Sequence, residues 1–422
     1  MRDVTQRHAR NAVINAPGYR FDIEGLRAIA ILLVAGYHVW GDGRVSGGVD
    51  VFLMISGFFV GGGLLRRMQS GQPFALGAYV RKLGRRLLPP LLLTLAAVVV
   101  GTWLWLPRSQ WSDVAGGVLA SATYTENWRM ALNGQAYAVA DPLSSPVQHI
   151  WSLSVQGQIF IALPILLLAA RAILGRAGLD ADQVLGALVA GIAVVTLGSL
   201  VYAVVGVREN QAFAYFDTAA RLWEYLAGTL VAVFAVRWAP RKGLATAMGW
   251  TGMLAILATG VALDGRATFP GLTALLPIGG AVLLIVAGLG AGASSRWSVS
   301  RFLAWRPLVT AGGYAYEFYL WHWVVLVFAL AATGRESFGW LAGGVVLLVS
   351  GVMAWAGRML VSRGPRTPAN VGEARARPRW TGRVPATAVL VLALAVPVGW
   401  LSYRGMNPWT GGGDLDPQVH PG

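Results

Sequence analysis

Eleven long apolar runs dominate the 422-residue sequence and constrain its fold more than any other feature. Each run is close to the ~20 residues that a helix needs to cross the hydrocarbon core of a bilayer. Because lipid offers the backbone no hydrogen-bond partners, runs of this length predict membrane-spanning helices. The predicted spans are residues 28–45, 48–65, 87–106, 148–170, 183–205, 219–236, 244–263, 271–291, 307–331, 338–357 and 385–402.

The composition also indicates a polytopic membrane protein. Charged residues make up only 13% of the chain and hydrophobic residues 55%, whereas a soluble domain carries roughly 25% charged residues. The sequence contains no cysteine, which excludes disulfides, a thiolate nucleophile and cysteine-bound zinc. The net charge of +15 comes from short basic clusters between apolar runs, so we do not expect a nucleic-acid partner.

Most of the 34 Lys and Arg residues lie in alternate connections between the runs. Cytoplasmic loops carry this excess in membrane proteins, so the N-terminus is predicted to be cytoplasmic and, after eleven spans, the C-terminus extracytoplasmic, in a bacterial-type plasma membrane. The long outer segment from Pro107 to Val147 could cover a site. The predicted division is a cytoplasmic segment 1–26, a ten-helix core 27–361, a basic cytoplasmic linker 362–384, an eleventh span 385–402 and an extracytoplasmic tail 403–422.

Ionisable residues inside predicted spans are few, and such residues mark a site by default because a bilayer makes them costly. Arg27 and His38 lie eleven residues apart at the first span, about 16 Å along a helix and on nearly the same face. This spacing suits an anionic donor that enters from the cytoplasm, with its reactive end near His38 as a general base. Each residue alone also fits a structural role, as a snorkelling arginine or a packed histidine.

Other charged residues allow two interpretations each. Asp50 begins the second span, where it either satisfies the positive end of the helix or contacts substrate. Arg221 and Glu224 are spaced i,i+3 and form either a structural ion pair or part of a site. Arg85 and Arg86 lie at the inner end of the third span, as topology anchors or as phosphate ligands.

The fourth span opens with a stretch, residues 148–158, that is too polar to face lipid. It must line protein or a water-filled cavity. His322 in the ninth span likewise needs no lipid exposure. No metalloprotease, serine-elbow, Walker or Rossmann motif is present, so the sequence gives no support for a metal site or for those reactions.

Together these separated motifs resemble the membrane acyltransferase-3 family over roughly residues 20 to 360, in the order in which the family carries them. The matching motifs are Asp22-Ile23-Glu24-Gly25-Leu26-Arg27 with His38, Gly48-Val49-Asp50-Val51-Phe52-Leu53-Met54-Ile55-Ser56-Gly57-Phe58, Arg85-Arg86-Leu87-Leu88-Pro89, His149-Ile150-Trp151-Ser152-Leu153-Ser154-Val155, Arg221-Leu222-Trp223-Glu224 with Gly228, and Tyr319-Leu320-Trp321-His322-Trp323.

The resemblance implies an all-α integral membrane protein with a ten-helix core plus an eleventh transmembrane helix. It implies an O-acyltransferase that moves an acyl group, often acetyl, from acyl-CoA to a glycan, a lipid or a natural product. Acyl-CoA is then a donor substrate, and no permanently bound cofactor is expected. The candidate residues are Arg27, His38 and Asp50 for catalysis, Arg27, Arg85 and Arg86 for the CoA phosphates, and Ser56, Trp151, Ser152, Ser154, Gln156, Arg221, Glu224 and His322 for substrate contact.

The chain departs from the family in one place. Many members carry Glu-Glu-Gln after the residues that match Ser154-Val155, and this chain has Gln156-Gly157-Gln158. An acid or base role there is therefore not expected, although Gln can donate and accept hydrogen bonds. Some relatives append an extracytoplasmic SGNH-type domain after the eleventh helix. This chain is either a stand-alone member or a membrane core that precedes such a domain, and the linker-like stretch from Asn407 to Gly422 favours the second alternative.

Two mechanisms and three functional classes stay open at this point. The acceptor hydroxyl could attack directly with His38 as base, or an acyl-enzyme could form on a serine such as Ser56 or Ser154. A secondary transporter would use the buried charges as coupling sites and release no CoA. A non-catalytic anchor for an outer domain would tolerate loss of Arg27 and His38.

Overall fold

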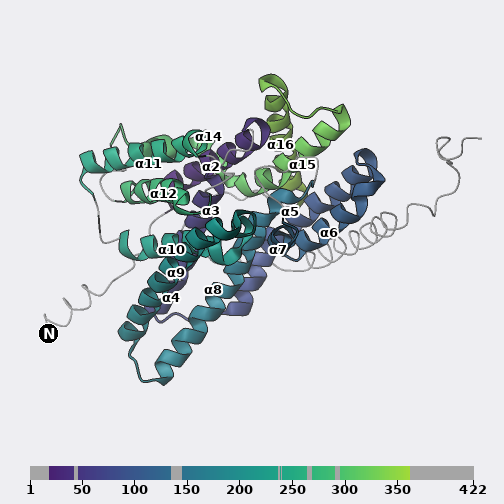
Figure 1. The fold of residues 1–422 in the computed structure, drawn as a ribbon. Helices are drawn as coiled ribbons and strands as arrows, with labels where there is room; N and C mark the ends of the chain where they lie inside the picture. Colours follow the sequence, from purple (N-terminus) through teal and green to yellow (C-terminus); the bar gives the residue numbers. More distant parts are fainter. Residues whose placement is uncertain are drawn as a thin grey trace, which may run out of the picture.

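The computed structural model describes residues 19–41, 46–134, 145–235, 238, 240–263, 269–289 and 295–361, and within these ranges all regular secondary structure is helical (Figure 1). The predicted linker 362–384, the eleventh span 385–402 and the tail 403–422 lie outside the described residues. The helical class of the fold is therefore confirmed for the described part of the chain.

Eight described segments are long and apolar enough to cross a membrane. They identify the chain as a multi-pass membrane protein. These segments are α2 (Phe21–Trp40), α3 (Gly48–Ser56) continued by α4 (Gly62–Gln69), α5 (Leu76–Trp105), α8 (Trp151–Arg176) with its preceding turn Gln148–Ile150, α9 (Ala181–Phe216), α11 (Lys242–Ala262), α15 (Ala315–Thr333) and α16 (Trp340–Val361).

The two other predicted core spans, 219–236 and 271–291, correspond to shorter helices. These are α10 (Thr218–Phe234) and α12 (Leu275–Ala287). Neither reaches the 18 residues that define a candidate span. Each of the ten predicted core positions thus holds a helix, but the count of ten membrane crossings is not confirmed.

Three predicted segments differ in detail from the structure. The outer segment 107–147 contains two helices, α6 (Trp111–Ala122) and α7 (Glu126–Leu132). The ninth span is broken at Tyr314 into α14 (Arg306–Gly313) and α15, and the short α13 (Val299–Leu303) precedes it. The third span begins eleven residues earlier than predicted, at Leu76, because its basic first half continues the helix; Arg85 and Arg86 therefore lie inside α5 and not at its end.

The second span packs unusually closely against α10. A π-helical turn, Gly57–Gly61, interrupts it between α3 and α4. A Cβ at Gly57 would overlap the backbone carbonyl of Tyr225, and one at Gly228 would overlap that of Met54. Only glycine allows two helix backbones to approach this closely. This contact fixes α3 and α10 side by side, which positions the charged residues that each helix carries.

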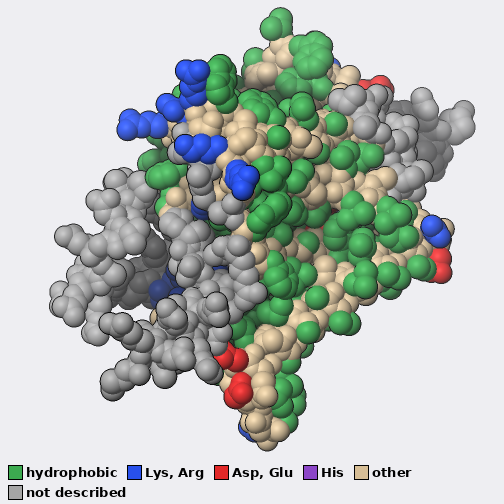
Figure 2. Space-filling model, turned by 90° about the vertical axis from the view of Figure 1, so that its left-hand side faces the viewer, with side chains coloured by type: hydrophobic (Ala, Val, Ile, Leu, Met, Phe, Trp, Pro, Cys, Tyr) green, Lys and Arg blue, Asp and Glu red, His purple; other side chains and the backbone are tan. Residues whose placement is uncertain are grey.

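Helices α2 and α3 lie in the interior of the bundle, with α14 and α12 on one side and α15 on the other (Figure 1). The outside is largely apolar: Figure 2 shows hydrophobic side chains over much of one face, with Lys and Arg gathered at one edge. Leu341 on α16 is 90% exposed and Val194 on α9 is 71% exposed. An apolar surface of this extent is typical of a protein that contacts lipid.

Candidate active site

Three of the chain's five histidines converge where α2, α8 and α15 meet. His38 Nδ1 lies 2.8 Å from His322 Nε2, and the two rings are parallel within 4°. The ring of His149 stands nearly perpendicular to that of His322, with the centroids 5.6 Å apart. His149 and His322 are 1% and 0% exposed. We call these three residues the histidine cluster; they do not form a metal-binding group.

Backbone carbonyls of α15 hold two of these rings. His322 Nδ1 lies 2.6 Å from the carbonyl oxygen of Tyr319 and 3.3 Å from that of Phe318. His149 Nε2 lies 3.2 Å from the carbonyl oxygen of Leu320. The other ring nitrogen of His149 has no hydrogen-bond partner. Main-chain carbonyls of α15 therefore fix the rings of His322 and His149, and His322 in turn contacts His38.

A second buried cluster joins α3 to α10. Arg221 Nη1 lies 2.9 Å from Asp50 Oδ1 and 2.8 Å from Glu224 Oε1. The three side chains are at most 1% exposed. Removing one member of such a buried group from its partners is strongly destabilising, whereas surface pairs contribute little. The sequence allowed two roles for Asp50, helix capping or substrate contact. The structure adds a third, because Asp50 forms an ion pair with Arg221.

Aromatic rings enclose the guanidinium of Arg221. Its Cζ lies 4.9 Å from the ring centroid of Tyr215, 5.1 Å from that of Phe269 and 5.3 Å from that of Trp151. Cations stack favourably on aromatic faces, most strongly on tryptophan. Trp151, predicted to contact substrate, therefore packs on Arg221.

A small cavity, about 30 Å³ in volume, connects the two clusters. Its lining includes His38 from the histidine cluster and Asp50 and Arg221 from the charged cluster, together with Tyr37 and Tyr215. A water molecule needs about 10–15 Å³ of such space, so the cavity accepts only a few atoms. An imidazole, a guanidinium and a carboxylate thus face one small cavity.

The polar residues at the start of α8 make three separate contacts. Ser152 Oγ lies 2.7 Å from the hydroxyl of Tyr319, beside the histidine cluster. The Nε2 atom of Gln156 donates to Ser56 Oγ over 2.5 Å. Ser154 donates to the carbonyl of Ile150, one turn back in its own helix, and is fully buried. Ser154 is therefore a structural hydroxyl and not an accessible nucleophile.

The candidate phosphate ligands lie apart from the cavity. Arg27 is on α2 with His38, as predicted, and pairs with Glu24 over 2.8 Å, one turn before it. Its side chain is 17% exposed. Arg85 and Arg86 are exposed on α5. None of the three lines the cavity, which fits a donor site distinct from the reaction site.

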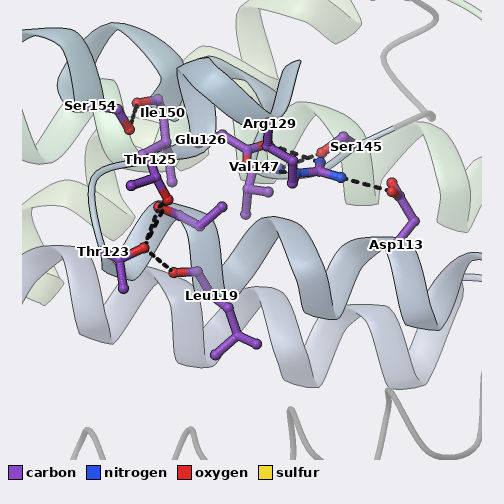
Figure 3. Close-up of polar contacts among 11 residues, drawn as sticks. Asp113, Leu119, Thr123, Thr125, Glu126, Arg129, Ser145, Val147, Ile150 and Ser154 are labelled. Atoms are coloured by element: carbon purple, nitrogen blue, oxygen red, sulfur yellow. Dashed lines mark hydrogen bonds and ion pairs between the residues drawn. The ribbon is translucent and has the colours of Figure 1, made fainter. Parts of the chain in front are cut away.

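Sequence reasoning missed the ion pairs of the outer helices. Arg129 of α7 bridges Glu126 and Asp113, at 2.9 Å and 2.8 Å (Figure 3). Glu126 is fully buried, and burial raises the pKa of its carboxyl to about 7 against the opposing effect of Arg129. The i,i+3 spacing of Glu126 and Arg129 was the available signal.

Sequence reasoning also left His149 out of the site. An ionisable residue at the start of a predicted span is the same signal that selected His38. Further along α8, Gln158 ties this helix to α7 and α10 through Asn127 and Thr218.

The fold is that of a multi-pass membrane protein, and its interior holds two clusters of buried ionisable side chains. The acyltransferase domain that characterises the acyltransferase-3 family matches residues 20–357. The chain belongs to this family. It is therefore an acyltransferase-3 O-acyltransferase, and the predicted class of enzyme is confirmed. The transporter and anchor alternatives gain no support.

Two curated relatives show how far the similarity extends. The chain is 29% identical to "Putative membrane-bound transacylase BcsY" of Komagataeibacter xylinus, over 91% of this chain and 92% of that protein. It is 27% identical to peptidoglycan O-acetyltransferase OatA of Listeria monocytogenes, over 72% of this chain and 49% of that protein. The chain thus spans about half the length of the second relative. No solved structure shows a significant match.

Proposed function

We propose that the protein transfers an acetyl group from cytoplasmic acetyl-CoA to a hydroxyl of an extracytoplasmic glycan or cell-envelope lipid. The observation that carries the proposal is the small cavity that His38 shares with Asp50 and Arg221. Within an acyltransferase family, a histidine and an arginine that face one small volume supply a base and an oxyanion partner.

The two-sided arrangement follows from the chemistry of the donor. CoA is large and multiply charged, so its phosphates are too costly to bring into a bilayer. Arg27, Arg85 and Arg86 would hold these phosphates at the cytoplasmic surface, because guanidinium groups pair well with phosphate oxygens. Only the thioester arm then has to reach the cavity, and only the acyl group continues to the acceptor.

In the proposed reaction His38 accepts the proton of the acceptor hydroxyl as its oxygen attacks the thioester carbonyl. The carbonyl oxygen becomes an oxyanion, to which Arg221 donates. The carbon–sulfur bond then breaks, and the CoA thiolate takes up the proton from His38. Asp50 and Glu224 hold Arg221 in place, since both carboxylates contact the same Nη1 atom.

Direct transfer is the mechanism that the contacts favour. Ser154, one candidate for an acyl-enzyme, donates its hydroxyl to a helix carbonyl. Ser56, the other candidate, is bonded to Gln156 and lies outside the lining of the cavity. A nucleophile must contact its base, and neither serine is bonded to a histidine in the described residues.

The acceptor class is supported by the relatives. One is named a transacylase and the other a peptidoglycan O-acetyltransferase. We infer a glycan or envelope hydroxyl as the acceptor on this basis. From the family resemblance we infer that an extracytoplasmic SGNH-type domain, if one is joined to this membrane core, would complete the transfer.

Binding of acetyl-CoA to the detergent-purified protein tests the proposal. We expect wild type and His38→Ala to bind, and Arg27→Ala and Arg85→Ala to bind at least about tenfold more weakly, which corresponds to about 1.4 kcal/mol. Arg176→Ala, an exposed basic residue at the end of α8, is the matched control and should bind as wild type does. Absence of acetyl-CoA binding by the wild-type protein would overturn the proposal.

A further inference from the structure

The proton positions in the histidine cluster follow from the carbonyl groups around His322. A carbonyl oxygen only accepts hydrogen bonds. His322 Nδ1 lies 2.6 Å from the Tyr319 carbonyl and 3.3 Å from the Phe318 carbonyl, so this nitrogen carries a hydrogen. An unprotonated Nδ1 would oppose its lone pair to two carbonyl oxygens in a site that is 0% exposed, which is unfavourable.

The proton on His322 Nδ1 determines the state of His38. In neutral His322 the other nitrogen, Nε2, is an acceptor. It lies 2.8 Å from His38 Nδ1, so His38 must donate there and carry its hydrogen on Nδ1. Neutral His38 then has its lone pair on Nε2. A doubly protonated His322 would be a buried cation whose contacts among the described residues are carbonyls, aromatic rings and two other histidines, which is costly.

We propose that His322 is a positioning residue that holds His38 in the Nδ1–H tautomer, so that His38 Nε2 is the atom that accepts the proton of the acceptor hydroxyl. This inference rests on the proposed function. It gives His322 a role different from the substrate contact predicted from the sequence. The hydrogen bonds run from the Tyr319 carbonyl through His322 to His38. In this arrangement His322 corresponds to the orienting group of a serine-hydrolase triad and His38 to its histidine; the orienting group fixes the tautomer and stabilises the imidazolium.

The surrounding contacts keep this chain in register. The hydroxyl of Tyr319 donates to the carbonyl of His149 over 2.5 Å, and His149 Nε2 donates to the Leu320 carbonyl over 3.2 Å. Trp323 packs edge-on against His38, with the ring centroids 4.8 Å apart. The turn of α15 that carries His322 is thus tied to the start of α8, and the imidazole of His38 is held between two side chains of α15.

The ¹⁵N chemical shifts of histidine side chains report the tautomer directly. In the ¹⁵N-histidine-labelled protein, at a pH well above the ordinary histidine value of about 6.5, we expect His38 to be protonated at Nδ1 and unprotonated at Nε2. The assignment comes from the signals lost in His38→Ala and His322→Leu. Gln can accept at its Oε1 atom, so His322→Gln should keep the His38 signal as in wild type, and His322→Leu should abolish the preference.

Turnover should follow the tautomer. We expect kcat of acyl transfer to fall by about 10²–10⁴-fold in His322→Leu, the range for loss of a proton-transfer group or of its orientation, with KM for acetyl-CoA unchanged. His322→Gln should recover at least about tenfold of that loss. Thr333→Ala, on the same helix at an exposed position, should leave both values unchanged.

Two outcomes separate this inference from the function on which it rests. A wild-type His38 that is protonated at Nε2 would overturn the positioning role, whatever the activity. A wild-type His38 with the expected tautomer, combined with full activity of His38→Ala, would instead overturn the proposed role of His38 as base. Equal activity of His322→Leu and wild type would also contradict the inference.

Discussion

Replacing Arg221 by methionine tests the charged cluster that joins α3 to α10. The variant keeps an unbranched side chain, shorter than arginine, but leaves Asp50 and Glu224 without the cation that lies 2.9 Å and 2.8 Å from them. The carboxylates are 1% and 0% exposed, so bulk water does not solvate them. Breaking a buried ion pair by removing one partner costs about 3–5 kcal/mol. We expect the free energy of unfolding to fall by that amount.

The assay is equilibrium unfolding of the purified protein in mixed detergent and SDS micelles. Arg176→Met removes an exposed arginine and should change the free energy of unfolding by less than about 0.5 kcal/mol. Adding Asp50→Asn to Arg221→Met should restore about 1–3 kcal/mol, because it removes one of the unpaired charges. A loss below about 1 kcal/mol for Arg221→Met, or no recovery in the double variant, would refute the assigned energetic role.

Three further predictions follow from particular contacts. Gly57→Ala would place a Cβ on a backbone carbonyl of α10 and should lower the free energy of unfolding by about 1–3 kcal/mol. As a control, a Cβ at Gly186 on α9 meets nothing within 4 Å. Gly186→Ala should therefore leave the free energy of unfolding unchanged or raise it by up to about 1 kcal/mol in the same assay. Burial raises the folded-state pKa of Glu126 from 4.5 to about 7, so the folded state binds the proton more tightly and the free energy of unfolding falls as pH rises between these values. Relative to wild type, Glu126→Gln should therefore gain up to about 3 kcal/mol of stability from pH 5 to pH 8. A stability difference between variant and wild type that does not change with pH would refute this. Since the chain has no cysteine, single-cysteine variants can be labelled in intact cells with a membrane-impermeant maleimide. Asn133→Cys should react and Ala177→Cys should not. The reverse labelling pattern would contradict the proposed orientation.

The helical class of the fold and several residues of the candidate site were predictable because both depend on local sequence patterns. A run of about 20 apolar residues predicts a span whatever its neighbours are. An ionisable residue within such a run, such as His38 or Arg221, is conspicuous for the same reason. The break at Tyr314 and the π-helical turn at Gly57 were not predictable from hydropathy, since they depend on which helices pack against these segments.

The partners of the site residues could not be read from the sequence. His38 and His322 are separated by 284 residues, and Asp50 and Arg221 by 171 residues. Apolar runs give the order of helices along the chain but not their arrangement in the bundle. The ion pairs of α6 and α7 were not predictable from hydropathy because their segment contains no long apolar run. Tertiary packing therefore decides which of two local interpretations, capping or pairing, applies to a residue such as Asp50.

Acyl transfer in inside-out membrane vesicles tests the central claim most directly. Such vesicles expose the cytoplasmic face to added [¹⁴C]acetyl-CoA, and both CoA release and label in enclosed envelope material can be measured. The account predicts transfer by wild type and none by His38→Ala, with acetyl-CoA binding retained in that variant. Right-side-out vesicles should show no transfer. Transfer by His38→Ala at the wild-type rate, or wild-type transfer only in right-side-out vesicles, would contradict the account.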